Sequence, residues 1–166
     1  MATVAAFDPL FLLTTLVRRN VRFVIIGGIA GRLWGSTTVT NDLDLCYARD
    51  RANLEALAEA LRELKVKLRG VDADLPFRAD ARTLKMGDHF TFTSIAGNLD
   101  LLGNPAGSGG YEALARTATT MDLDEMEVLV SSLDDLILMK RAAGRPKDLV
   151  EIEILGAVRD ELEQAE

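Results

Sequence analysis

The stretch RFVIIGGIAGRLWGSTTVTNDLDL, at residues 22–45, decides the fold of this chain. It opens with a mostly apolar run that ends at Gly27-Gly28, and this pattern predicts a buried strand that enters a tight turn. A short helix is expected over residues 29–34, and a second strand over residues 39–47. A strand, a glycine turn, a helix and a strand in this order predict the beginning of a sheet with helices packed on it.

The second strand carries the first candidate site residues. Residues two apart on a strand point to the same face, so Asp42 and Asp44 project together while the leucines that follow them face the core. Hard oxygen ligands of this kind favour Mg²⁺, which shares its coordination shell with substrate phosphates. Asp100 also lies between two leucines, and we expect it to supply a third carboxylate from a neighbouring strand. A pair of aspartates at a solvated strand end is the simpler alternative.

The rest of the chain alternates between helical and extended patterns. Helical spacing and capping residues predict helices over residues 8–19, 50–64, 80–86, 111–117 and 132–143, and from 146 onward. Alternation and turn residues predict a β-hairpin over residues 89–95 and 97–102, and a last short strand over 126–130. These elements predict one α/β (α+β) domain over residues 1–166. Its mixed sheet core is expected over about 20–130, flanked by helices, and a helical portion over about 131–166.

Composition narrows the class of protein. Of 166 residues, 48% are hydrophobic and 27% charged, which is typical of a globular protein. One cysteine excludes an internal disulfide, and the apolar residues 9–13 are too few to span a membrane, so we expect a cytoplasmic protein with no membrane partner. The net charge of −7 argues against binding along duplex DNA. A mononucleotide or a short RNA end, held by a few cations or by a metal ion, remains compatible with it.

Other motifs support competing functions less well. Residues 26–31 do not match the dinucleotide-binding pattern, and no Gly-Lys-Ser/Thr end of a phosphate-binding loop is present. His89 is the only histidine, which excludes a zinc site with several His or Cys ligands. Cys46 is expected to be a small buried residue. The basic residues from Lys140 to Lys147 have an alternative role, in which their positive charges only complement the dipole at the C-terminus of a helix.

Four ordered blocks resemble one protein family. They are Gly27-Gly28-Ile29-Ala30, TNDLDL at residues 40–45, GNLDLL at residues 97–102 and KRAAGRPKD at residues 140–148. Together they are similar to the AbiEii-like branch of the nucleotidyltransferase superfamily, which includes toxins of bacterial toxin–antitoxin systems. The resemblance spans roughly residues 22–155.

The resemblance implies a role for each matching position near the two aspartates. Gly27 and Gly28 would shape the turn against a nucleoside triphosphate. Asp42 and Asp44 would ligate Mg²⁺ or Mn²⁺. Asp100 would complete the metal site and help to activate the attacking group.

The resemblance also implies the reaction and the phosphate-binding residues. Lys140 would neutralise phosphate charge, and Arg145 and Lys147 are expected beside it. An acceptor group would attack the α-phosphorus of the triphosphate, release pyrophosphate and keep the nucleotidyl group. The acceptor stays open among an RNA end such as that of tRNA, a protein and a small molecule, and an antitoxin partner is compatible with the family.

One position departs from the family pattern. Family members often carry arginine four residues before the first aspartate, and this chain has Thr38 there. Either another cation, Arg32 or Lys140, compensates for the missing arginine, or the chain is a catalytically weak or inactive nucleotide-binding or partner-binding module of the same fold.

Overall fold

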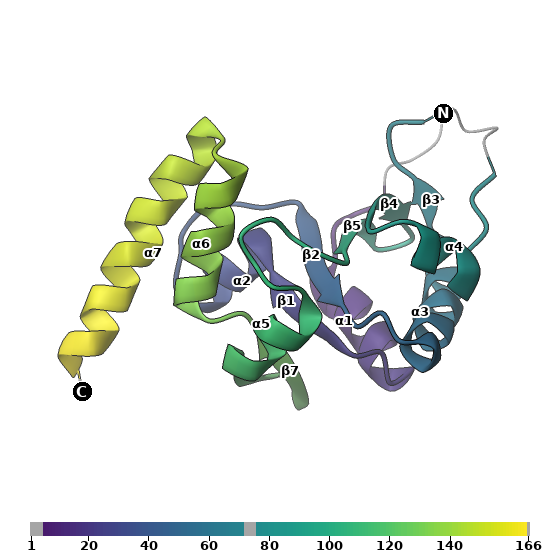
Figure 1. Cartoon of the computed structure of the whole chain (residues 1–166), viewed down its shortest axis with the longest axis horizontal. Helices are drawn as coiled ribbons and strands as arrows, with labels where there is room; N and C mark the ends of the chain where they lie inside the picture. The colour runs from purple at the N-terminus through teal and green to yellow at the C-terminus, as the bar shows by residue number, and fades with distance from the viewer. Residues whose placement is uncertain (1–4, 72–75, 166) are drawn as a thin grey trace.

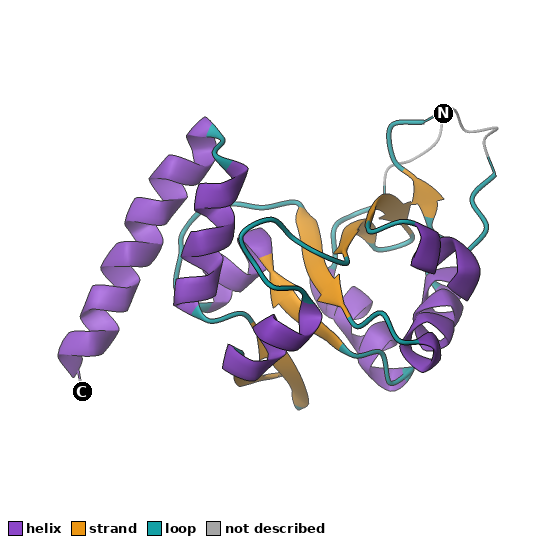
Figure 2. Cartoon of the chain, viewed as in Figure 1, coloured by secondary structure: helices purple, strands orange, loops and turns teal. Residues whose placement is uncertain are grey.

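A seven-stranded mixed sheet runs through the computed structural model, which describes residues 5–71 and 76–165 (Figures 1 and 2). Four of its strand pairs are antiparallel, and the pairs β2–β5 and β1–β7 are parallel. In spatial order the strands are β3 (Lys67–Leu68), β4 (His89–Ser94), β5 (Gly97–Leu102), β2 (Asp42–Tyr47), β1 (Phe23–Ile26), β7 (Met126–Val130) and β6 (Thr119–Leu123).

Helices flank this sheet, and two of them form the C-terminal portion. They are α1 (Pro9–Arg18), α2 (Gly27–Leu33), α3 (Arg51–Glu63), α4 (Ala81–Met86), α5 (Tyr111–Thr117), α6 (Leu133–Ala143) and α7 (Pro146–Ala165). Figure 1 shows α6 and α7 lying side by side at one end of the molecule, with α3 and α4 at the other. The expected mixed sheet flanked by helices, with a helical C-terminal portion, is confirmed.

Capping side chains define where four of these helices begin. Asp8, Asp50, Asp80 and Ser132 each accept a hydrogen bond from the backbone N–H three residues further on. At its other end α6 stops at Gly144, whose φ of 65° is a left-handed conformation that favours glycine. The chain therefore turns sharply there and enters α7.

The core lies where β1 and β2 cross the middle of the sheet. Every residue of β1 is buried, as its apolar sequence predicts. In β2 the residues alternate: Leu43 and Leu45 are fully buried, while Asp42 and Asp44 are half-buried on the opposite face. The polar face of β2 is thus free to take part in a site.

Two strands were not expected from the sequence. β6 pairs with β7, and the turn that joins them consists of Asp124 and Glu125, which both have positive φ. This is the backbone of a tight hairpin turn, but it lacks the glycine or asparagine that usually marks one. β3 has only two residues, too few to show alternation. The helix expected over 29–34 begins earlier, at Gly27, and the strand expected from 39 begins at Asp42.

No helix in the described part of the chain has the length and apolar character to cross a membrane.

Candidate active site

The three predicted aspartates meet on two neighbouring strands. Parallel pairing of β2 with β5 places Asn98 opposite Asp42 and Asp100 opposite Asp44. The Asn98 side-chain amide donates a hydrogen bond of 3.0 Å to Asp42 Oδ1. The carboxylates therefore lie on one face of the sheet although 56 residues separate the strand positions 42 and 98 in the sequence.

Asp44 is the carboxylate whose negative charge is least stabilised by its surroundings. Its burial, and then the negative charge of Asp100 beside it, raise the pKa of Asp44 to about 7, while the Lys140 ammonium acts in the opposite direction. Two carboxylates this close repel each other when both are ionised. A further positive charge nearby would therefore stabilise the ionised pair.

Arg69 supplies a positive charge to Asp100 that the sequence analysis missed. Its guanidinium donates a hydrogen bond of 2.6 Å to Asp100 Oδ1 and another of 3.0 Å to the carbonyl of Phe92. Arg69 follows the two-residue strand β3, in a stretch without a motif. Only the pairing of β3 with β4, and of β4 with β5, brings it near the aspartates, so no local pattern could have identified it.

The glycine turn lies directly against Asp44. β1 ends at Ile26, opposite Asp44 on β2. Gly27 has a φ of +68°, and a Cβ at this position would lie 2.8 Å from Asp44 Cγ. A Cβ on Gly28 would lie 2.8 Å from Thr40 Cβ. Glycines are therefore required for the chain to pass this close to the carboxylates.

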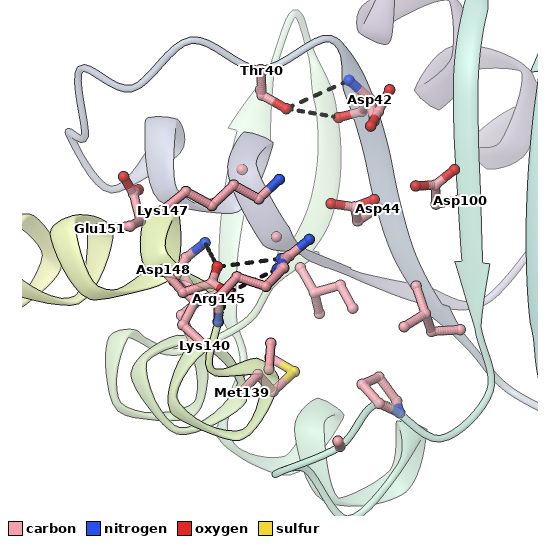
Figure 3. Close-up of a pocket in the computed structure, with 18 of the residues that line it drawn as sticks. Thr40, Asp42, Asp44, Asp100, Met139, Lys140, Arg145, Lys147, Asp148 and Glu151 are labelled. Carbon is pink, nitrogen blue, oxygen red and sulfur yellow. Dashed lines mark hydrogen bonds and ion pairs between the residues drawn. The ribbon is translucent and has the colours of Figure 1, made fainter.

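Three cations come from the corner between α6 and α7. Lys140 lies on α6, Arg145 lies before α7, and Lys147 is in the first turn of α7. Asp148 is buried among them, with its Oδ2 2.8 Å from Arg145 Nε and its Oδ1 4.0 Å from Lys140 Nζ. Figure 3 shows Lys147 and Arg145 extended toward the aspartates.

Asp148 holds this corner together as an anion. Burial alone would raise the pKa of its carboxyl, but hydrogen bonds from the Arg145 side chain and backbone outweigh burial and hold the pKa below its ordinary value. Because a carboxylate that is hydrogen-bonded to two N–H groups is strongly oriented, Asp148 fixes where the Arg145 guanidinium points.

A pocket of about 710 Å³ separates the aspartates from the cations. This volume is in the range of pockets that hold small molecules and cofactors. All eight site residues predicted from the sequence line it: Gly27, Gly28, Asp42, Asp44, Asp100, Lys140, Arg145 and Lys147.

Comparison with known proteins gives a structural match. No protein-family model matches the sequence, and no curated protein is significantly similar to it. The crystal structure of the lincosamide antibiotic adenylyltransferase LnuA, bound to lincomycin, aligns with a TM-score of 0.62 over 93% of this chain and 99% of that chain. The chain has a nucleotidyltransferase fold. The sequences are 13% identical, so this match establishes the fold alone.

A second solved structure shows a weaker likeness to this nucleotidyltransferase fold. The antibiotic-resistance factor ANT(2″)-Ia aligns over 93% of this chain and 92% of its own, at 18% identity. Its TM-score is 0.47. Neither structure tests the AbiEii-like branch, which stays a prediction.

Thr38 makes its hydrogen bonds to other protein groups in this nucleotidyltransferase fold, whereas an arginine at this position would bind phosphate. The Thr38 hydroxyl donates a hydrogen bond to Glu151 on α7, and the Thr38 carbonyl accepts one of 3.2 Å from Arg32. Arg32 is exposed and is not part of the pocket lining. Of the two cations expected to compensate for the missing arginine, only Lys140 therefore lies in the pocket, and Lys147 lies there with it.

The donor set suits a hard divalent cation, although the side chains are not arranged around one. Within residues 5–71 and 76–165, no group of three His, Cys, Asp or Glu side chains has the arrangement of ligands around one metal ion. Asp42 bonds to Asn98, and Asp100 bonds to Arg69. Asp44, whose burial beside another carboxylate disfavours its charge, is the group that a cation would stabilise most. Asp42 lies next to it on the same strand face.

Proposed function

We propose that this chain is a nucleotidyltransferase that moves a nucleoside monophosphate from a nucleoside triphosphate to an acceptor, with Mg²⁺ or Mn²⁺ as cofactor. One observation carries the proposal: a pocket of about 710 Å³ has carboxylates on one wall and cations on the facing wall, inside a nucleotidyltransferase fold. A triphosphate with its metal ion needs both kinds of wall, because the ion binds carboxylates and the phosphates bind cations.

The two walls of the pocket would bind different parts of the metal–triphosphate complex. Asp42 and Asp44 would hold the metal ion, which neutralises charge on the phosphates when bound. Lys140, Arg145 and Lys147 would bind phosphate oxygens from the other side. The glycine turn at Gly27-Gly28 would leave room for the triphosphate beside Asp44. Positioning and charge stabilisation provide most of the catalysis of phosphoryl chemistry, so few other groups are needed.

The proposed reaction exchanges one bond at the α-phosphorus for another. An acceptor hydroxyl or amine forms a bond to the α-phosphorus while the bond between that phosphorus and the bridging oxygen of pyrophosphate breaks. Pyrophosphate leaves with the electron pair, and the proton of the attacking group passes to a carboxylate. Asp100, on the wall beside Asp44, is the carboxylate proposed for that proton.

The test is transfer of label from each of the four α-labelled ribonucleoside triphosphates, with Mg²⁺ or Mn²⁺, to bulk RNA, protein or small hydroxyl and amine compounds. We expect transfer by the wild type and its loss in Asp44→Asn, because the buried carboxylate is then neutral. Asp122→Asn, on the exposed edge strand β6, is the matched control and should keep full activity. Failure of the wild type to consume any triphosphate with any acceptor would refute the proposal.

Two classes of acceptor follow from different observations. LnuA acts on a lincosamide antibiotic, which motivates small hydroxyl compounds as acceptors, whereas the four sequence blocks motivate tRNA or protein acceptors and an antitoxin partner. Expression of the chain in a bacterial host distinguishes the two: a toxin arrests growth unless Asp44 is replaced, and a resistance enzyme does not.

Thr38 favours a second candidate function, a module that binds nucleotide without turnover. Its hydroxyl is engaged with Glu151, so this position offers no cation to the triphosphate. Such a module would gain thermal stability with Mg²⁺ and a triphosphate, yet form no product with any acceptor.

A further inference from the structure

A row of polar side chains crosses four neighbouring elements of the sheet. Asp44 on β2 lies opposite Asp100 on β5, and Asp100 lies opposite Thr91 on β4. The pairing of β3 with β4 continues one residue beyond β3, where the backbone N–H of Arg69 donates to the Thr91 carbonyl at 2.9 Å. Arg69 is therefore the last member of a row that begins at the candidate metal-binding carboxylates.

The Arg69 guanidinium is fixed in two directions. One nitrogen donates to the carbonyl of Phe92 at 3.0 Å, and the other donates to Asp100 Oδ1 at 2.6 Å. The ion pair is largely shielded, with side-chain exposures of 29% for Arg69 and 14% for Asp100. A short, charge-assisted hydrogen bond in such a place orients its carboxylate far better than an exposed surface pair does.

The three carboxylates are consequently unequal. Asp42 bonds to a neutral amide, that of Asn98, and Asp44 is buried with a carboxylate as its neighbour. Asp100 is the one of the three that pairs with an arginine in the described part of the chain. Because a neighbouring cation weakens the attraction between a carboxylate and a metal ion, a divalent ion would favour Asp42 and Asp44 over Asp100.

We propose that Arg69 is a positioning residue, which holds Asp100 at the pocket wall as the hydrogen-bond acceptor for the attacking group, while a metal ion would bind Asp42 and Asp44. Arg69 occupies Oδ1 of Asp100, so Oδ2 is the oxygen that receives the proton of the acceptor. This inference rests on the proposed function. It revises the expectation from the sequence, in which Asp100 was also a metal ligand.

The kinetic test compares Arg69→Met with Arg69→Lys in the transfer assay. A well-placed general base contributes about 10²–10⁴-fold, so loss of its orientation in Arg69→Met should lower kcat by about 10-fold or more. KM for the triphosphate should change less than about twofold on the same reasoning, because the phosphate-binding groups lie on the other wall. Arg69→Lys should recover part of kcat. Lys67→Met, which removes a cation two residues earlier on β3, is the control and should keep the wild-type kcat.

A second readout does not depend on turnover. Affinity for Mn²⁺ with a non-hydrolysable triphosphate, measured by electron paramagnetic resonance, should be unchanged or tighter in Arg69→Met and much weaker in Asp44→Asn. An unchanged kcat in Arg69→Met, a loss confined to KM, or Mn²⁺ binding weakened as in Asp44→Asn would each overturn the inference.

Failure of the proposed function gives a different result. In that case the wild type transfers no nucleotide at all, and the positioning role falls with it. Thermal unfolding of Arg69→Met, Asp100→Asn and the double variant measures separately how strongly the two side chains interact. We expect Arg69→Met to destabilise the wild type more than it destabilises Asp100→Asn, and equal effects in both backgrounds would show that Arg69 does not act through Asp100.

Discussion

Gly27 and Asp44 are neighbours at the point where β1 ends beside β2, and their contact connects the fold to the candidate site. Gly27 combines a left-handed φ of +68° with the absence of a Cβ next to the Asp44 side chain. A side chain here would both strain the backbone and displace the Asp44 carboxylate.

Replacement of Gly27 by alanine tests this relation. We expect Gly27→Ala to lower stability by about 1–3 kcal/mol, the range for an L-residue in a sparsely populated conformation, and to weaken metal-dependent nucleotide binding. Urea unfolding and thermal shift with Mg²⁺ and a triphosphate measure the two effects. Gly156→Ala on α7 is the control: apart from the neighbouring backbone of the helix, no atom lies within 4 Å of where the new Cβ would be, and alanine should stabilise the helix by about 0.5–1 kcal/mol. An equal effect of the two substitutions would contradict this account of Gly27.

Several residues of the candidate site could be predicted from the sequence. Asp42, Asp44 and Asp100 could be named because alternation on a strand assigns a face to each residue, and all three line one pocket. Arg69 could not be named, because its place follows from the register of β3 on β4 and of β4 on β5. Glu151, on α7, was missed for the same reason: its contact with Thr38 joins positions 113 residues apart.

At the scale of elements, the turn between α6 and α7 decides where the cationic wall lies. Gly144 ends α6 in a left-handed conformation, and Asp148 then binds both Arg145 and Lys140. The ion pairs thus connect the end of one helix to the beginning of the next.

Replacement of Asp148 by asparagine tests this connection through pH. The folded protein holds the pKa of Asp148 below its ordinary value, so this carboxylate stabilises the fold above the unfolded-state pKa and loses that contribution as the pH falls through the folded-state pKa. We expect Asp148→Asn to be less stable than the wild type by about 1–2 kcal/mol at pH 7, discounted because Arg145 is partly exposed. The difference should shrink below about pH 4. A difference that is constant from pH 3 to pH 7 in urea unfolding would contradict it.

The elements themselves were predicted where capping and periodicity act locally. The caps Asp8, Asp50, Asp80 and Ser132 begin the helices that they were expected to begin. β6 was missed because its turn has positive φ at two acidic residues, and β3 because a two-residue strand exists only through its pairing partner. Neither signal is present in the local sequence.

For the whole molecule, the distribution of charge matters more than its total. The chain carries a net charge of −7, which repels a triphosphate at long range. The cations on the α6–α7 side of the pocket and a metal ion on the carboxylate side would reverse this locally. Nucleotide binding is therefore expected to depend on divalent metal, and the single-domain organisation of residues 1–166 stays a prediction.

We expect a triphosphate to lie between the carboxylate wall and the cationic wall. A crystal structure with Mg²⁺ and a non-hydrolysable nucleoside triphosphate measures this directly. We predict a metal ion bound to Asp42 and Asp44, with phosphate oxygens in contact with Lys140 or Lys147 and with Arg69 still bonded to Asp100. A triphosphate bound outside this pocket, or bound within it with no metal ion on Asp42 and Asp44, would contradict the account.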